Sequence, residues 1–278
     1  MSPSPPTAFG ARLHALLAER GPLCVGIDPH ASLLEAWGVG DSVQGLRRFC
    51  AAVVEALAGQ VAVLKPQSAF FERFGSTGIG VLEETLAGIR AGGALALLDV
   101  KRGDVGSTMT AYAQAYLDPA SPLAADAITA SPYLGFGSLR PLLEAAARHH
   151  RGVFVLALTS NPEGAAVQHA RTAAGGTVAQ AILDDIAAAN AGVAPLGSVG
   201  AVIGATIGAT GHDFSALNGP ILAPGVGAQG GTVADLRRLF GAALPGVLAS
   251  ASRDVLAAGP APAALREAAA RLVDELTR

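Results

Sequence analysis

The segment GALALLDVKRGD, residues 93–104, joins an apolar run to a dense cluster of charges. The apolar half has the length and composition of a buried strand. Residues i and i+2 of a strand lie on one face, so Asp99 and Lys101 are expected to point the same way. Gly103 allows a turn that brings Asp104 back beside them. The segment therefore predicts two carboxylates on either side of one ammonium group.

A lysine in such a position is suited to donating a proton. Burial alone favours the neutral amine, whereas neighbouring negative charge favours the ammonium form. Flanked by Asp99 and Asp104, Lys101 is expected to stay protonated. We therefore interpret Lys101 as a proton donor and not as a nucleophile that forms a Schiff base.

Short apolar runs of this kind recur along the whole chain, separated by alanine-rich helical stretches. Continuous apolar runs are typical of parallel strands covered on both faces, and strand–helix alternation implies right-handed crossovers. The eight runs are Leu23–Ile27, Val61–Lys65, Ala94–Asp99, Ala127–Thr129, Gly152–Leu158, Val199–Ile203, Pro220–Ala223 and Gly246–Ser250. They predict an α/β fold, a (β/α)8 TIM barrel that forms a single domain over residues 1–278, with residues 1–8 as a loose lead-in.

Apolar residues at a helical period predict the helices between these runs. The clearest is Ser42–Ala58, with Ser42 as its N-cap. The others are Thr108–Leu117, Leu139–His149, Thr177–Asn190, Val233–Phe240 and Pro262–Thr277. The segment Ser160–Gly176 is long for a loop, and we expect a mobile or functional excursion there.

The composition limits the classes of function. The 278 residues carry 19 basic and 22 acidic side chains, a net charge of -3, which gives no basic field for nucleic acid or an anionic membrane. The chain shows no signal-peptide layout and no uninterrupted apolar stretch of membrane-spanning length. Cys24 and Cys50, each amid apolar residues, are expected to be buried free thiols. These features predict a cytoplasmic protein.

Polar residues follow the apolar runs, at the ends where TIM barrels carry their chemistry. A structural ion-pair network is the alternative explanation for the charged ones. Because buried ion pairs stabilise a fold poorly, a ring of alternating charges is better explained by function. The residues in question are Asp28, Lys65, Asp99, Lys101, Asp104, Thr159, Ser160, Gln229 and Arg253.

A phosphate site is predicted at the last two strands. Residues 222–231, LAPGVGAQGG, form a glycine-rich loop after the seventh run, and Arg253 follows the eighth. Glycines expose backbone N–H groups and an arginine adds two parallel donors, and barrels commonly bind phosphate at this place. The pair indicates a phosphorylated ligand.

No metal site is predicted. The six histidines show no metal-ligand spacing, and the sequence holds neither a nucleophile elbow nor a P-loop. We expect surface or loop positions for all six, which are His14, His30, His149, His150, His169 and His212.

Three longer strings resemble the orotidine 5'-monophosphate decarboxylase family, in particular its longer bacterial branch. They are LKPQSAFFE (64–72), DVKRGDVGST (99–108) and SPYLG (131–135), and Asp28, Gln229 and Arg253 also resemble family residues. The similarity runs from Leu23 to Leu256. The D-x-K-x-x-D core alone is shared with a wider group of barrel enzymes that act on sugar phosphates.

The resemblance implies decarboxylation of orotidine 5'-monophosphate to uridine 5'-monophosphate, the last step of de novo pyrimidine nucleotide synthesis, without a cofactor. It implies that Lys101 protonates C6 of the pyrimidine after carbon dioxide leaves, with Asp99 close to the substrate carboxylate. In the family the counterparts of Asp104 and Thr108 enter the site of the neighbouring subunit, which implies a homodimer with shared active sites.

The resemblance also implies a role for each remaining site residue. Asp28, Lys65 and Thr108 would hold ribose hydroxyls. Ser160 would hold the pyrimidine edge, with Thr159 as its nearest competitor, and Gln229 and Arg253 would hold the phosphate. The implied catalytic residues are Lys101, Asp99, Asp104 and Lys65, and the implied substrate-binding residues are Asp28, Thr108, Ser160, Gln229 and Arg253.

Two other functions stay open at this point. A metal-dependent sugar-phosphate decarboxylase or aldolase of the related barrel group would use Asp99 as a magnesium ligand. Such a site needs a second carboxylate after the second strand, where this chain has Lys65. A barrel that only binds a phosphorylated ligand is the non-enzymatic alternative, and it gives no reason for the charges around Lys101.

Overall fold

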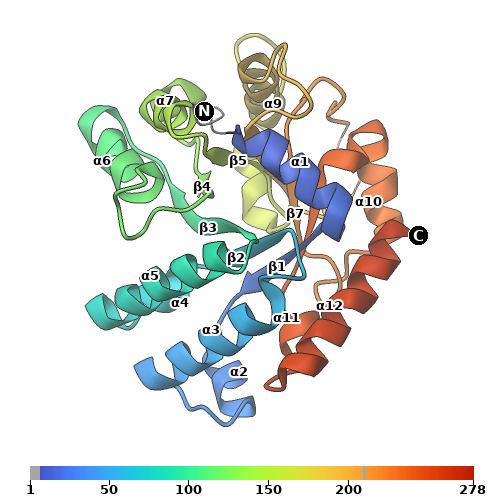
Figure 1. The fold of residues 1–278 in the computed structure, drawn as a ribbon. Helices are drawn as coiled ribbons and strands as arrows, with labels where there is room; N and C mark the ends of the chain where they lie inside the picture. The colour runs from blue at the N-terminus through green and yellow to red at the C-terminus, as the bar shows by residue number, and fades with distance from the viewer. Residues whose placement is uncertain (1–6, 209–210) are drawn as a thin grey trace, which may run out of the picture.

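A closed barrel of eight parallel strands, in the order β1 to β8, forms the centre of the molecule (Figure 1). The structure is a computed structural model that describes residues 7–208 and 211–278. The strands are β1 Leu23–Ile27, β2 Val63–Pro66, β3 Leu95–Arg102, β4 Ala127–Ala130, β5 Gly152–Leu158, β6 Val199–Ile203, β7 Ile221–Pro224 and β8 Val247–Ala251. The predicted TIM barrel is confirmed, and the largest difference in bounds is at β3, which continues beyond Asp99.

Helices surround the barrel (Figure 1). Those predicted are present as α3 Val43–Leu57, α6 Gly106–Leu117, α7 Arg140–Arg148, α9 Val178–Ala189, α10 Val233–Phe240 and α12 Pro262–Thr277. Ser42 caps α3 as predicted, because its hydroxyl accepts a hydrogen bond from the Gly45 N–H at 3.1 Å. Four short helices precede or follow the longer ones: α2 Ala31–Ala36, α4 Ala69–Glu72, α8 Ala165–Gln168 and α11 Arg253–Leu256.

Two long helices are absent from the prediction, α1 Phe9–Arg20 and α5 Gly75–Ala91. The four glycines of α5 lower its helical propensity and hide the pattern. One of them serves packing, since a Cβ on Gly78 would lie 2.1 Å from the Phe71 carbonyl oxygen. Tertiary packing, which propensity does not report, therefore forms this helix.

The excursion at residues 160–176 is folded. It holds a 3-10 turn, Pro162–Gly164, the short helix α8, and a bridge between Arg171 and Thr177. The Gln168 side chain fastens it to the end of β5: its amide oxygen accepts from the Thr159 N–H at 3.0 Å, and its amide nitrogen donates to the Thr159 hydroxyl at 2.7 Å.

The barrel interior is filled by alternate strand residues and is closed at one end by α1. This helix crosses the end at which the strands begin (Figure 1) and inserts Phe9 and Leu13 among the interior side chains. Phe9 meets Phe154 of β5 edge to face, with ring centroids 6.0 Å apart. The interior strand residues are Cys24, Val63, Leu95, Leu97, Ala127, Phe154, Val202, Leu222 and Leu248. Only the opposite end of the barrel is left for a ligand.

Both cysteines are buried free thiols, as predicted. Burial raises the pKa of Cys24 and of Cys50 to about 12, so both stay protonated. Within the described ranges, no helix is long and apolar enough to cross a membrane.

Phe9→Ala should destabilise the protein by about 3–5 kcal/mol, because it removes a large buried ring and leaves a cavity at the closed end of the barrel. Chemical unfolding monitored by circular dichroism would measure this loss. Glu19→Ala in the same helix is the control; its side chain is 65% exposed, and the expected change is within about 0.5 kcal/mol. Equal stabilities of the two variants would contradict the conclusion that α1 stabilises the barrel by closing one end of its interior.

Candidate active site

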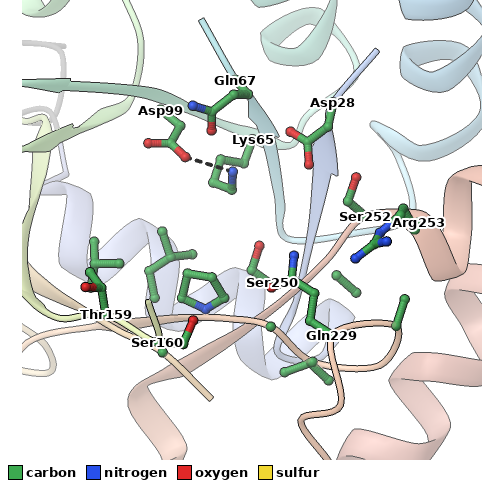
Figure 2. A pocket seen from close by; sticks show the side chains of 18 of the residues that line it. Asp28, Lys65, Gln67, Asp99, Thr159, Ser160, Gln229, Ser250, Ser252 and Arg253 are labelled. Atoms are coloured by element: carbon green, nitrogen blue, oxygen red, sulfur yellow. Dashed lines mark hydrogen bonds and ion pairs between the residues drawn. The ribbon is translucent and has the colours of Figure 1, made fainter. Parts of the chain in front are cut away.

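A cavity of about 620 Å³ opens at the carboxyl ends of the strands (Figure 2). Its walls continue the inward-facing series of each strand. In β3 the interior residues Leu95 and Leu97 are followed by Asp99 and Lys101, so the prediction that these two share a face is confirmed. The same step of two leads from Val63, Ala127 and Leu248 of the interior to three further lining residues, Lys65, Thr129 and Ser250.

Most of the predicted site residues meet in this cavity. Those that line it are Asp28, Lys65, Asp99, Lys101, Thr159, Ser160, Gln229 and Arg253. Two of the predicted residues, Asp104 and Thr108, do not line it. Apolar side chains of β5, β6 and β7 complete the wall, namely Leu156, Leu158, Val202 and Leu222.

Asp99 is the centre of the charged group. Its side chain is only 8% exposed. Its Oδ2 accepts a hydrogen bond from Lys65 Nζ at 3.1 Å, and its Oδ1 accepts from Lys101 Nζ at 2.6 Å and from the Thr129 hydroxyl at 2.8 Å. One carboxylate therefore lies between two ammonium groups. This is the reverse of the predicted pair of carboxylates around one lysine.

Asp104 does not return to Lys101 within the chain, so the predicted turn is wrong. The Asp104 carboxylate accepts from the Val105 N–H at 2.8 Å. Gly103 has a packing role, since a Cβ there would lie 2.2 Å from the Ser131 carbonyl oxygen. The left-handed backbone belongs to Lys101 itself, with φ 47°. Thr108 is exposed near the start of α6.

For Asp99 and Lys65, attraction between opposite charges shifts the pKa values more than burial does. Burial alone raises the pKa of Asp99, but Lys65 and Lys101 hold it far below its usual range. Burial alone lowers the pKa of Lys65, but the carboxylates of Asp99 and Asp28 keep it above the usual value. Lys65 and Asp99 are therefore both charged at neutral pH, and Figure 2 shows them joined, with Asp28 on the other side of Lys65.

Asp28 has spare hydrogen-bonding capacity beside this group. Its Oδ1 is buried and has no hydrogen-bond partner within the part of the chain that the structure describes. A buried carboxylate oxygen without a donor is costly, and a ligand hydroxyl would satisfy it.

Gln229 and Arg253 lie at the far side of the cavity from Asp99 in the view of Figure 2. Gln229 belongs to the glycine-rich loop after β7, and Arg253 begins α11 after β8. The Asp254 carboxylate holds this loop by accepting from the Ala228 N–H at 2.9 Å. Gly227, with φ 76°, permits this contact, because a Cβ there would lie 2.5 Å from Asp254 Oδ2. The loop was expected to expose its backbone N–H groups, but those of Gly227, Gly230 and Gly231 donate to carbonyl oxygens of the same loop. The feature of this side that suits an anionic group such as a phosphate is therefore the Arg253 guanidinium.

Thr159 and Ser160 both line the cavity, but the Thr159 hydroxyl is already engaged. It donates to the Asn161 side-chain oxygen at 2.6 Å and accepts from Gln168 Nε2 at 2.7 Å. Ser160 is exposed in the cavity wall. The preference for Ser160 over Thr159 as a ligand-binding residue stays a prediction.

Several residues that line the cavity were not predicted from the sequence, among them His30, Gln67, Thr129 and Ser250. His30 was expected at the surface; it is exposed, yet it lines the cavity, and its ring packs on Phe70 with centroids 4.3 Å apart. Gln67, Thr129 and Ser250 continue the inward alternation of their strands. That alternation, counted from the apolar runs, was the signal that could have found them.

Comparisons with known proteins agree with this geometry. The sequence profile of the "Orotidine 5'-phosphate decarboxylase / HUMPS family" matches residues 21–268. Orotidine 5'-phosphate decarboxylase of Salinispora tropica is 66% identical over 266 residues, covering 96% of each chain. The Streptomyces coelicolor enzyme is 59% identical over 268 residues, again with 96% of each chain covered.

Solved structures give the same result. The crystal structure of a Streptomyces avermitilis protein assigned to this activity has a TM-score of 0.96 at 57% identity, covering 100% of this chain and 97% of that one. Leishmania donovani OMP decarboxylase has a TM-score of 0.75 at 31% identity, covering 98% of each chain. On the evidence of profile, relatives and structure, this chain belongs to the orotidine 5'-phosphate decarboxylase / HUMPS family.

Proposed function

We propose that the cavity at the barrel mouth is where this chain decarboxylates orotidine 5'-monophosphate to uridine 5'-monophosphate and carbon dioxide, a step of pyrimidine biosynthesis. The reaction is that of the relatives that are 59–66% identical along nearly the whole chain. The observation that carries the assignment is the Lys65–Asp99–Lys101 group. It lies in a cavity that is also lined by the glycine-rich loop after β7 and by Arg253.

The charge of Lys101 answers the main chemical difficulty of this reaction. Loss of carbon dioxide leaves an electron pair on C6, a carbon with no adjacent electron sink. A cation fixed in advance at that carbon stabilises the developing charge without the cost of reorganisation. Asp99 fixes Lys101 Nζ at 2.6 Å, and Lys101 then transfers its proton to C6. The lysine side chain is 44% exposed, so it can regain a proton from solvent once the product leaves.

The other lining residues are proposed to bind the substrate. Asp28, with its unsatisfied oxygen, and Lys65 are placed to hold ribose hydroxyls, and Ser160 is placed to hold the pyrimidine edge. Gln229 and Arg253 are proposed to hold the phosphate. Binding energy gained at the phosphate, far from the reacting carbon, can then be used to close loops around the substrate.

A homodimer with shared sites is part of the proposal. Asp104 and Thr108 lie outside the cavity of their own chain, so a role for them in the reaction requires a second copy. Large apolar side chains are exposed close to them in sequence and in the adjoining loop after β4: Val105 is 56% exposed, Tyr133 81% and Leu134 52%. The loop after β4 contacts the end of β3, since the Ser131 N–H donates to the Arg102 carbonyl oxygen at 2.9 Å. Such a patch supports a protein interface.

The reaction is tested by following the ultraviolet absorbance of orotidine 5'-monophosphate with purified protein, with and without a chelator. We expect loss of the orotate chromophore in both conditions, with uridine 5'-monophosphate as the product. Loss that stops in the chelator would support the metal-dependent alternative. No change with folded protein would contradict the proposed reaction.

Two substitutions should separate chemistry from binding. Lys101→Asn keeps a residue that tolerates the left-handed backbone but removes the proton donor, so kcat should fall by about 10²–10⁴-fold or more while uridine 5'-monophosphate still binds. Arg253→Ala removes a charge-assisted contact and should weaken nucleotide binding by about 10- to 100-fold. Steady-state kinetics and calorimetric titration would measure both. Indistinguishable effects of the two variants would contradict this division of roles.

Mixing two inactive variants tests whether sites are shared. Lys101→Asn and Asp104→Asn chains are each expected to be inactive as homodimers. After exchange of subunits, one site of each mixed dimer would have an intact Lys101 and an intact Asp104 from its neighbour. We therefore expect activity to return. Absence of activity after mass spectrometry has verified mixed dimers would contradict shared sites.

A further inference from the structure

We infer that Thr129 is a positioning residue for the decarboxylation: its buried hydroxyl fixes both the Asp99 carboxylate and the backbone of Lys101, and so aligns the two groups that face the reacting carbon. This inference rests on the proposed function of the same cavity. Thr129 ends the inward-facing series of β4, is 1% exposed, and lies in the cavity wall.

The ladder between β3 and β4 is interrupted where the reacting groups lie. Leu98 pairs with Ile128, but the next pair joins Arg102 to Ala130, so β3 advances four residues while β4 advances two. The intervening residues of β3 form a bulge, and bulges re-aim side chains near active sites. The bulge includes Lys101, whose φ of 47° is strained for a residue with a side chain.

Side chains replace the missing ladder bonds at Lys101. Its N–H donates to Thr129 Oγ1 at 2.9 Å, and its carbonyl oxygen accepts from the Ser131 hydroxyl at 3.0 Å. A strained conformation persists only where its surroundings determine it, and these two contacts do so from β4 and from the loop that follows it. Thr129 is the buried member of the pair.

The direction of the Thr129 hydrogen bonds is fixed by chemistry. A backbone N–H can only donate, so the hydroxyl oxygen accepts from Lys101. The single hydroxyl proton is then left for Asp99 Oδ1, 2.8 Å away. The same Oδ1 accepts from Lys101 Nζ at 2.6 Å. Thr129 is thus hydrogen-bonded directly to the backbone of Lys101. It is linked to the Lys101 ammonium group indirectly, because both donate to the Asp99 carboxylate.

Removing the hydroxyl would leave two groups unsatisfied at the bulge, the Lys101 N–H and one acceptor site of Asp99. Each could then move to find another partner, and Nζ would move with them. Small misplacements of a reacting group cost about 10²-fold in rate. The phosphate side of the cavity is formed by other strands, so nucleotide binding should change little.

The test compares Thr129→Val with Thr129→Ser in the full-length protein. Valine keeps the shape of threonine and removes the hydroxyl, whereas serine keeps the hydroxyl. Thr129→Val should lower kcat by about 10- to 100-fold, with KM and the Kd for uridine 5'-monophosphate within about threefold of wild type. Thr129→Ser should restore kcat to within about threefold.

Thr85→Val is the matched control. The Thr85 hydroxyl is also buried and donates to the Val81 carbonyl oxygen at 2.7 Å, but it lies in α5 and does not line the cavity. Its loss should affect stability and leave kcat unchanged. If Thr129→Val does not fold, Thr129→Cys takes its place, because a thiol is similar in size and a weak donor.

Three results would overturn the inference: a Thr129→Val or Thr129→Cys enzyme with wild-type kcat, a Thr129→Ser enzyme as slow as the valine variant, or a loss of nucleotide binding as large as the loss of kcat. Wild-type turnover is measured first. Its absence would contradict the proposed function itself, whereas an unaffected variant beside an active wild type would contradict only the role of Thr129.

Discussion

The Asp99 carboxylate, held between Lys65 and Lys101, is the interaction on which the arrangement of the site depends. Removing the charged groups of Asp99 and Lys65 from water is expensive, and a buried ion pair seldom repays that cost in stability. Here every oxygen of the carboxylate is bonded, with Lys65 on one side and Lys101 and Thr129 on the other. The group is best understood as a fixed array of charge that is prepared for a reaction, with its cost borne by the rest of the fold.

The barrel supplies that support through a simple geometric rule. Inward-facing residues alternate along every strand, so an apolar interior near the beginning of the strands leads directly to polar side chains at their ends. Helix α1 closes the interior with Phe9 and Leu13. Because this end is filled, the charged group rests on a packed interior and meets ligands only from the mouth. Rigid support of this kind keeps fixed charges aligned at little cost during the reaction.

The side of the cavity with Asp99 and the side with Arg253 are held in place by different local structures. The side with Asp99 relies on side chains that replace backbone pairing at a bulge. The side with Arg253 relies on a glycine-rich loop that is held by hydrogen bonds within the loop and to Asp254. On the first side, two lysines lie beside the two carboxylates of Asp99 and Asp28, so their charges balance. On the second side, Arg253 makes no ion pair among the residues that the structure describes, so it can pair with a negatively charged ligand. This division is what a substrate with a reacting carboxylate and a remote phosphate requires.

The sequence by itself determined the barrel, because eight apolar runs separated by helical stretches have few other ways to bury both faces of a sheet. It also determined that Asp99 and Lys101 share a face, since the alternation of a strand is a local property. The family resemblance added the assignments of the residues that meet in the cavity, and these remain proposals. Helix α5 was not found, because its glycines hide a helix that packing stabilises.

Only the tertiary structure decided how the charges are paired. The turn expected at Gly103 is replaced by a bulge that places the left-handed backbone at Lys101, because Gly103 must lie against Ser131 of the neighbouring loop. Thr129, thirty residues away from Asp99, completes that bulge. A contact between two strands depends on register and on what each neighbour presents, and neither is written in the local pattern of one strand. The local sequence set which side chains face inward, and the packing of β3 against β4 set which of them meet.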